Sequence, residues 1–207
     1  MKNATKHAEV LKSLLRKLIR EHKPASKEPL DPLKALVRGT MSFDVSDHRA
    51  DEAMRLIDRE FVDLNELRVA TDLEVQELLG QKYPAIEKRV AMITQSLNAI
   101  FEREQTLNLN RMKEISRRDA RQFMRELPKI HPFVEAFVML FSFDGACVPI
   151  DNAMLAWLRG EGVIEEEATL EEAQKFVEHQ LKADECYEMY VCVRREARED
   201  ASRRKAK

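Results

Sequence analysis

Apolar side chains recur every three or four residues along most of this chain, which is the period of an amphipathic α-helix. Val10, Leu11, Leu14, Leu15 and Leu18 set this pattern near the start of the sequence. No segment alternates with the two-residue period of a strand, so the sequence predicts an all-α fold. Helices are expected over residues 5–22, 31–39, 44–61, 85–103, 116–126, 133–142, 151–160, 169–182 and 185–197.

Capping residues mark several of these boundaries. Asp31 precedes Pro32, a combination typical of a helix start, and Ser116 opens a variant of the capping box. Thr71 indicates the start of one of the short helices expected between residues 61 and 85. The tail from Arg194 onward carries charges of both signs and is expected to fray.

Composition limits the classes of function. Charged residues make up 35% of the chain and aromatic residues 6%, which favours helices over a β-sandwich. The formal net charge of −2 excludes a uniformly basic nucleic-acid coat but allows a local basic face. Basic residues gather in segments 1–27 and 111–129, and acidic residues gather in segment 161–185. The alternative for each of these segments is that its charges only form the solvent-exposed face of a helix.

Two features indicate a protein of the cytoplasm. The chain has three cysteines and begins with no signal peptide, which favours a reducing compartment. The longest apolar run, residues 133–143, is interrupted by Glu135 and Ser142 and is too short to span a bilayer. No membrane partner is therefore expected.

The most informative stretch is Leu127-Pro-Lys-Ile-His-Pro-Phe-Val134. Sixteen residues separate its end from Asp151, the last residue of Val148-Pro-Ile-Asp. In order and spacing it resembles the hairpin and catalytic aspartate of the helix-hairpin-helix DNA glycosylase superfamily, in the endonuclease III branch. Asp31-Pro-Leu-Lys-Ala-Leu is similar to the first barrel helix of that family, and Asp44-Val-Ser46 stands where the family has Thr-Asp-Val-Ser.

The resemblance implies a two-lobed endonuclease III-like fold. Residues 31–144 would form a six-helix barrel lobe that ends in the helix-hairpin-helix element. Residues 1–30 and 145–207 would form a discontinuous second lobe.

The hairpin itself departs from the family pattern. The two glycines that let the family's backbone amides approach a DNA phosphate are replaced by Lys129 and His131, and Pro132 removes a further donor. One interpretation is a helix–helix turn that has lost its grip on phosphate. In the other, DNA contacts come from the hairpin residues and the preceding helix, namely Lys129, Ile130, His131, Arg121 and Arg125.

The expected catalytic groups are also incomplete. The position of the family's Schiff-base lysine holds Phe133, which cannot act as a nucleophile, so AP-lyase chemistry is not expected. Asp151 remains as the candidate catalytic carboxylate, which would stabilise a cationic sugar; the alternative is that it only caps a helix. Met41 and Phe133 are candidates for a base wedge or pocket, and core packing is the alternative for Met41.

No cofactor is expected. The resembling enzymes hold a [4Fe–4S] cluster with four closely spaced cysteines after the last helix, whereas this chain has only Cys186 and Cys192 there. The histidines show no metal-binding spacing.

The leading hypothesis is a protein that binds double-stranded DNA weakly and largely without sequence preference, and is at most a monofunctional N-glycosylase of base-excision repair type. The alternative is a catalytically inactive descendant that binds DNA or a protein partner. A helical interaction module with no DNA role is a third class, kept open by the acidic segment 161–185.

Overall fold

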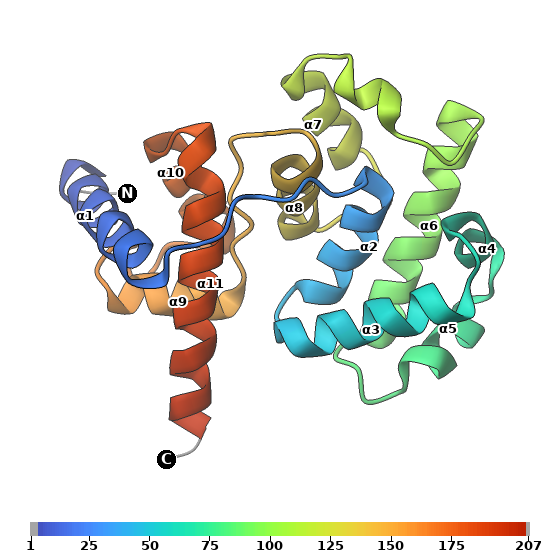
Figure 1. Ribbon diagram of the computed structural model, residues 1–207, viewed down its shortest axis with the longest axis horizontal. Helices are drawn as coiled ribbons and strands as arrows, with labels where there is room; N and C mark the ends of the chain where they lie inside the picture. Colours follow the sequence, from blue (N-terminus) through green and yellow to red (C-terminus); the bar gives the residue numbers. More distant parts are fainter. Residues whose placement is uncertain (1–3, 206–207) are drawn as a thin grey trace. The chain divides into compact units, whose positions relative to one another are not determined.

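The computed structural model describes the backbone of residues 4–205 and the side chains of residues 4–203. Every regular element in this range is helical, so the predicted all-α class is confirmed (Figure 1). The elements are α1 (Ala4–His22), α2 (Pro32–Ser42), α3 (Asp47–Glu60), α4 (Leu64–Val69), α5 (Asp72–Leu79), α6 (Ile86–Glu104), the 3-10 helix η1 (Asn110–Lys113), α7 (Arg117–Arg125), α8 (Pro132–Ser142), α9 (Asn152–Gly160), α10 (Leu170–Gln180) and α11 (Ala183–Lys205). None of the described helices combines the length and the apolar character that crossing a membrane would require.

The chain divides into two compact units. Unit 1 combines Met1–Glu28 with Asp144–Lys207, and unit 2 is the continuous segment Pro29–Phe143. The two ends of the chain, far apart in sequence, therefore build one unit together.

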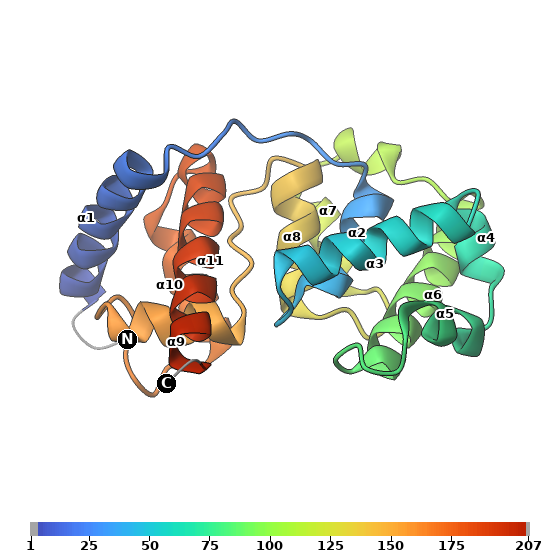
Figure 2. The same cartoon turned by 60° about the horizontal axis from the view of Figure 1, so that its bottom comes forward.

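Unit 2 is organised around α2, which contacts α3, α6 and α8, while α4 and α5 pack on α6 (Figure 2). Gly39 allows the close approach of α2 to α8, since a Cβ at this position would lie 3.2 Å from the side chain of Phe137. The α8 helix is buried along most of its length, as the apolar residues on nearly all of its sides predict.

The C-terminal end of α2 is held by α6 and the turn before it. The guanidinium of Arg89 donates to the carbonyl oxygens of Thr40, Phe43 (2.6 Å) and Pro84 (2.7 Å). The hydroxyl of Tyr83 donates to the carbonyl of Met41 at 2.8 Å. The bonds to Thr40, Met41 and Phe43 satisfy carbonyls that the end of α2 leaves unpaired, and the bond to Pro84 ties the same guanidinium to the turn before α6.

In unit 1, α11 packs against both α1 and α9, and α10 packs on α9. The α11 helix reaches Lys205, so the expectation that the tail from Arg194 frays is wrong. Exposed pairs at i,i+4 spacing, Arg195 with Glu199 and Glu199 with Arg203, support the extension.

Candidate nucleic-acid interface

The candidate hairpin is the turn that joins α7 to α8. The amide of Ile130 donates to the carbonyl of Leu127 (3.3 Å), and the hydroxyl of Ser96 donates to the carbonyl of Pro128 (3.3 Å). At the tip, exposed Lys129 has a φ of 57°, in the left-handed region that favours glycine. The turn thus adopts a glycine-type conformation with a lysine, at a cost of roughly 1–2 kcal/mol.

The amides at the start of α8 are already used within the chain. Pro132 has no N–H, and the amide of Phe133 donates to the imidazole Nδ1 of His131 at 3.1 Å. The amides of Val134 and Glu135 both donate to the carbonyl of His131, at 2.8 and 3.1 Å. A phosphate therefore cannot take these donors without breaking bonds that stabilise the helix start.

His131 is half-buried and lies against the ring of Phe43, with ring centroids 4.0 Å apart. Burial lowers the pKa of His131 below its usual value of 6.5; the negative charge of Asp44 opposes this shift and the positive charge of Arg89 adds to it. The net direction favours the neutral imidazole. Because Nδ1 accepts the Phe133 amide, the neutral ring carries its proton on Nε2 and offers one uncharged donor.

Two of the candidate DNA-binding arginines share one carboxylate. Arg121 and Arg125 on α7 each donate through Nε to a different oxygen of Glu135, the second at 3.0 Å. The Glu135 side chain is buried at the contact between α7 and α8. This carboxylate offsets part of the positive charge of α7. In the sequence, Glu135 stood out only as an interruption of an apolar run, and its pairing with the two arginines was not predicted.

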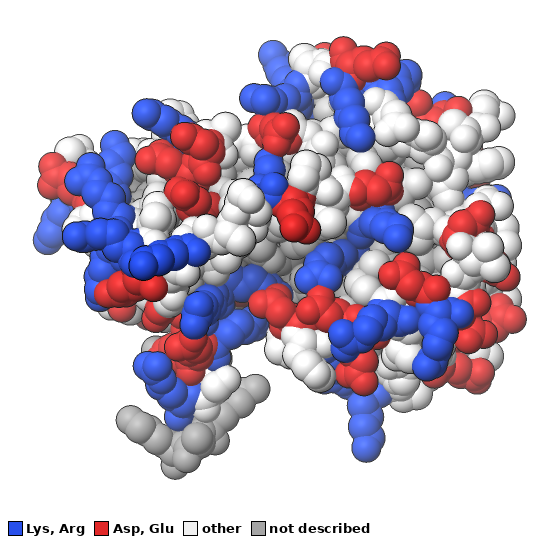
Figure 3. All heavy atoms as spheres, in the orientation of Figure 1, with Lys and Arg blue, Asp and Glu red and all other residues white. Residues whose placement is uncertain are grey.

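The remaining candidate cations of this region are exposed. Arg117 and Arg118 in the first turn of α7 and Lys129 at the hairpin tip all face solvent. Figure 3 shows basic and acidic side chains interspersed over the face displayed. Any nucleic-acid interface on such a surface depends on a few cations.

Asp151 caps α9 in unit 1. Its carboxylate accepts from the amide of Met154 at 2.9 Å, from Arg194 at 3.1 Å, and from Arg198. Asp151 is 0% exposed and Arg194 is 3% exposed. One carboxylate is thus enclosed by a helix N-terminus and two guanidinium groups, and the two arginines were not predicted.

Phe133 and Met41 both lie in the core of unit 2. Phe133 contacts Phe43 and Phe137, with ring centroids 5.4 and 6.2 Å apart. Met41 is 0% exposed, in the α2 segment held by Arg89 and Tyr83. Met41 would therefore have to leave the core to act as a wedge. The candidate residues other than Asp151, including Ile130 in the turn, lie in unit 2, and Asp151 lies in unit 1.

The chain does not fit a four-cysteine iron–sulfur cluster. The whole sequence contains three cysteines, Cys147, Cys186 and Cys192, and all three are buried. Burial raises the pKa of Cys186 to about 12 and that of Cys192 to about 11, which opposes the thiolate form that binds metal. Within the described residues, no three His, Cys, Asp or Glu side chains are grouped as a metal site would need.

Comparison with solved structures identifies the fold. An 8-oxoguanine glycosylase/lyase from Clostridium acetobutylicum, in complex with double-stranded DNA, superposes with a TM-score of 0.72 at 17% identity, covering 93% of this chain and 70% of that chain. An endonuclease III trapped as a covalent intermediate with DNA also gives 0.72, at 12% identity and with 93% and 85% covered. A thermostable thymine-DNA glycosylase gives 0.68, at 10% identity and with 93% and 87% covered.

The chain therefore has the helical fold of endonuclease III and related DNA glycosylases, as the hairpin and its spacing to Asp151 predict. No protein-family model and no curated protein matches the sequence.

Proposed function

We propose that this protein binds the backbone of double-stranded DNA through the α7–α8 hairpin and does not cleave DNA at abasic sites. The observation that carries the proposal is the hairpin tip, where exposed Lys129 occupies the left-handed conformation that glycine favours. A chain that keeps this conformation with a lysine presents a cation at the point where the resembling enzymes bring backbone amides to a phosphate. The α8 amides are used internally, so side-chain charge supplies the contact and binding is weak.

Base removal is the second question, and we propose that Asp151 is structural. A carboxylate that stabilises a cationic sugar must present uncompensated negative charge to it. Arg194 and Arg198 both donate to this carboxylate, so their positive charges offset the one that catalysis would use. The alternative is a monofunctional N-glycosylase, in which Asp151 stabilises the sugar while water hydrolyses the N-glycosidic bond. What favours this alternative is the resemblance of Asp151, in its position before α9, to the catalytic aspartate of the endonuclease III branch.

Replacing Lys129 with asparagine should weaken DNA binding without altering the hairpin. Asparagine tolerates the left-handed region, so the substitution removes charge and keeps the conformation. We expect the parent to bind a short duplex with a Kd of about 10⁻⁴–10⁻⁶ M at physiological salt. The variant should bind about 3–10-fold more weakly, and the slope of log K against log salt should fall by about 1. Fluorescence anisotropy over a salt series measures both quantities.

The matched control is Lys175→Asn, which removes an exposed lysine from α10 in unit 1. It should leave the salt slope unchanged. Equal losses in the two variants would show that binding reports only the overall charge, and the hairpin assignment would fail.

Borohydride should trap no covalent adduct between this protein and DNA with an abasic site. Trapping requires a lysine amine that forms an imine with the sugar, and the matching position holds Phe133, packed against Phe43 and Phe137. Gel electrophoresis of borohydride-treated mixtures, with a glycosylase/lyase run in parallel, measures the adduct. An adduct at the level of that control enzyme would refute the proposal, and its absence from Lys129→Asn would identify the amine.

A further inference from the structure

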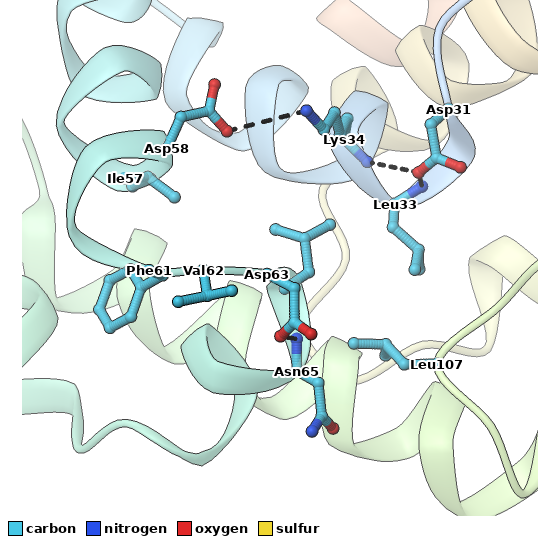
Figure 4. Close-up of a pocket in the computed structure, with 11 residues that line it drawn as sticks. Asp31, Leu33, Lys34, Ile57, Asp58, Phe61, Val62, Asp63, Asn65 and Leu107 are labelled. Carbon is cyan, nitrogen blue, oxygen red and sulfur yellow. Dashed lines mark hydrogen bonds and ion pairs between the residues drawn. The ribbon is translucent and has the colours of Figure 1, made fainter.

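Unit 2 carries two grooves that meet at the end of α3. The first, about 620 Å³, lies between α2, α3 and the start of α4, with Leu33 and Leu107 directed into it (Figure 4). The second, about 590 Å³, lies between the end of α3 and helices α4 and α5. Phe61 lines both grooves. Because most of the charged side chains that line them are carboxylates, we refer to the two together as the acidic grooves.

The acidic grooves expose apolar side chains that the fold does not use. Val62 is 94% exposed and lines the first groove, and Val69 is 63% exposed and lines the second. Grouped apolar exposure of this kind is typical of surfaces that bind another protein.

Seven carboxylates and one lysine line the two grooves. They are Asp31, Asp58, Glu60, Asp63, Glu66, Glu74 and Glu77, with Lys34. Several have local tasks, since Asp31 and Asp63 cap α2 and α4, and Glu74 completes the capping box of α5. Capping does not remove their charge; the hydrogen bonds from Thr71 lower the pKa of Glu74 and favour its carboxylate form.

We propose that the acidic grooves bind a basic amphipathic segment of another protein. Its apolar side chains would enter the grooves beside Val62 and Val69, and its lysines or arginines would face the surrounding carboxylates. Phosphate would be repelled here, which separates this surface from the hairpin between α7 and α8. The inference does not rest on the proposed DNA binding. The grooves lie on α2 to α5 and are lined by negative charges, whereas the proposed DNA contact lies between α7 and α8 and depends on positive charges.

The test is an NMR titration of the ¹⁵N-labelled full chain with a synthetic peptide. The probe is an amphipathic peptide of leucine and lysine about 14 residues long, enough to form a helix on binding. Its control carries glutamate in place of every lysine. We expect saturable amide shifts centred on Val62, Asp63 and Val69 with the basic peptide, and no such shifts with the acidic one.

Two variants locate the site. Asp58→Lys combined with Glu77→Lys reverses one exposed charge in each groove and should weaken peptide binding at least tenfold. Val62→Ser removes an almost fully exposed side chain, so folding is undisturbed, and should weaken binding about threefold or more. The matched control is Glu166→Lys with Glu167→Lys, which makes the same change of charge on exposed residues of unit 1 and should change affinity less than twofold.

Three results would overturn the proposal. One is an equal loss of affinity in the groove variant and the unit 1 control, which would mean attraction by net charge alone. Another is a set of shifts centred on α10 instead of the grooves. The third is groove shifts that grow with protein concentration in the absence of peptide, which would identify a second copy of this chain as the occupant.

Discussion

Replacing Asp151 with alanine should lower the free energy of unfolding by about 3–5 kcal/mol. The carboxylate is fully buried and pairs with Arg194, which is also buried, and with Arg198. Removing it takes the Asp151 charge away from a desolvated guanidinium, and this cost exceeds the net value of the intact pair. The substitution also removes the cap of α9, worth about 1 kcal/mol. Asp151→Asn, which can still cap, should therefore be about 1 kcal/mol less destabilising.

Urea unfolding followed by tryptophan fluorescence measures this effect in the relevant unit. Trp157 is the only tryptophan of the chain and lies on α9, the helix that Asp151 caps. Thr169→Ala is the matched control, because Thr169 caps α10 in the same unit without an ion pair. It should cost about 1 kcal/mol.

The result decides between the two roles of Asp151. A triple variant, Asp151→Ser with Arg194→Met and Arg198→Met, should recover most of the lost stability, since removing all members of a buried ionic group is often nearly neutral. If the unfolding free energy of Asp151→Ala is instead within about 1 kcal/mol of the parent value, the ion pairs of this carboxylate with α11 do not stabilise the fold. The proposal of a structural aspartate would then be wrong.

Much of the fold was predictable because its signals are local. Thr169 caps its helix through atoms of Thr169 and Glu172 alone, and Asp31 caps α2 through the amides of the next few residues. Helix periods and caps of this kind read directly from a window of the sequence. The α11 extension was missed because exposed i,i+4 pairs add little to a periodic apolar pattern.

The candidate site was less predictable because its decisive contacts are distant in sequence. Arg194 meets Asp151 across 43 residues, and Arg121 meets Glu135 across 14. Nothing near Asp151 indicates that its charge is compensated. The left-handed conformation of Lys129 has no signal in the lysine itself and was not predicted. The roles of the candidate site residues in DNA binding stay predictions.

Replacing Glu135 with glutamine should destabilise unit 2 and strengthen DNA binding at the same time. The carboxylate is buried and accepts from both Arg121 and Arg125. Glutamine keeps one acceptor oxygen, so the change removes one of the two charged hydrogen bonds and leaves the other with a neutral acceptor, which should cost about 2–3 kcal/mol of unfolding free energy. The two arginines, 24% and 51% exposed, would lose the negative charge that Glu135 supplies. If they face DNA, affinity should rise about tenfold and the salt slope should steepen by as much as about 2.

Anisotropy titrations with one duplex at several salt concentrations measure the gain, and circular dichroism at the same temperature confirms that the variant is folded. Glu171→Gln is the matched control, since it makes the same chemical change on an exposed residue of α10 that pairs with Lys175. An exposed pair contributes little, so stability and salt slope should both stay near the parent values. A folded Glu135→Gln variant that binds DNA no better than the parent would mean that α7 does not face the duplex. In that case Glu135 serves only to join α7 to α8, and the DNA contact through the hairpin would have to rest on Lys129 alone.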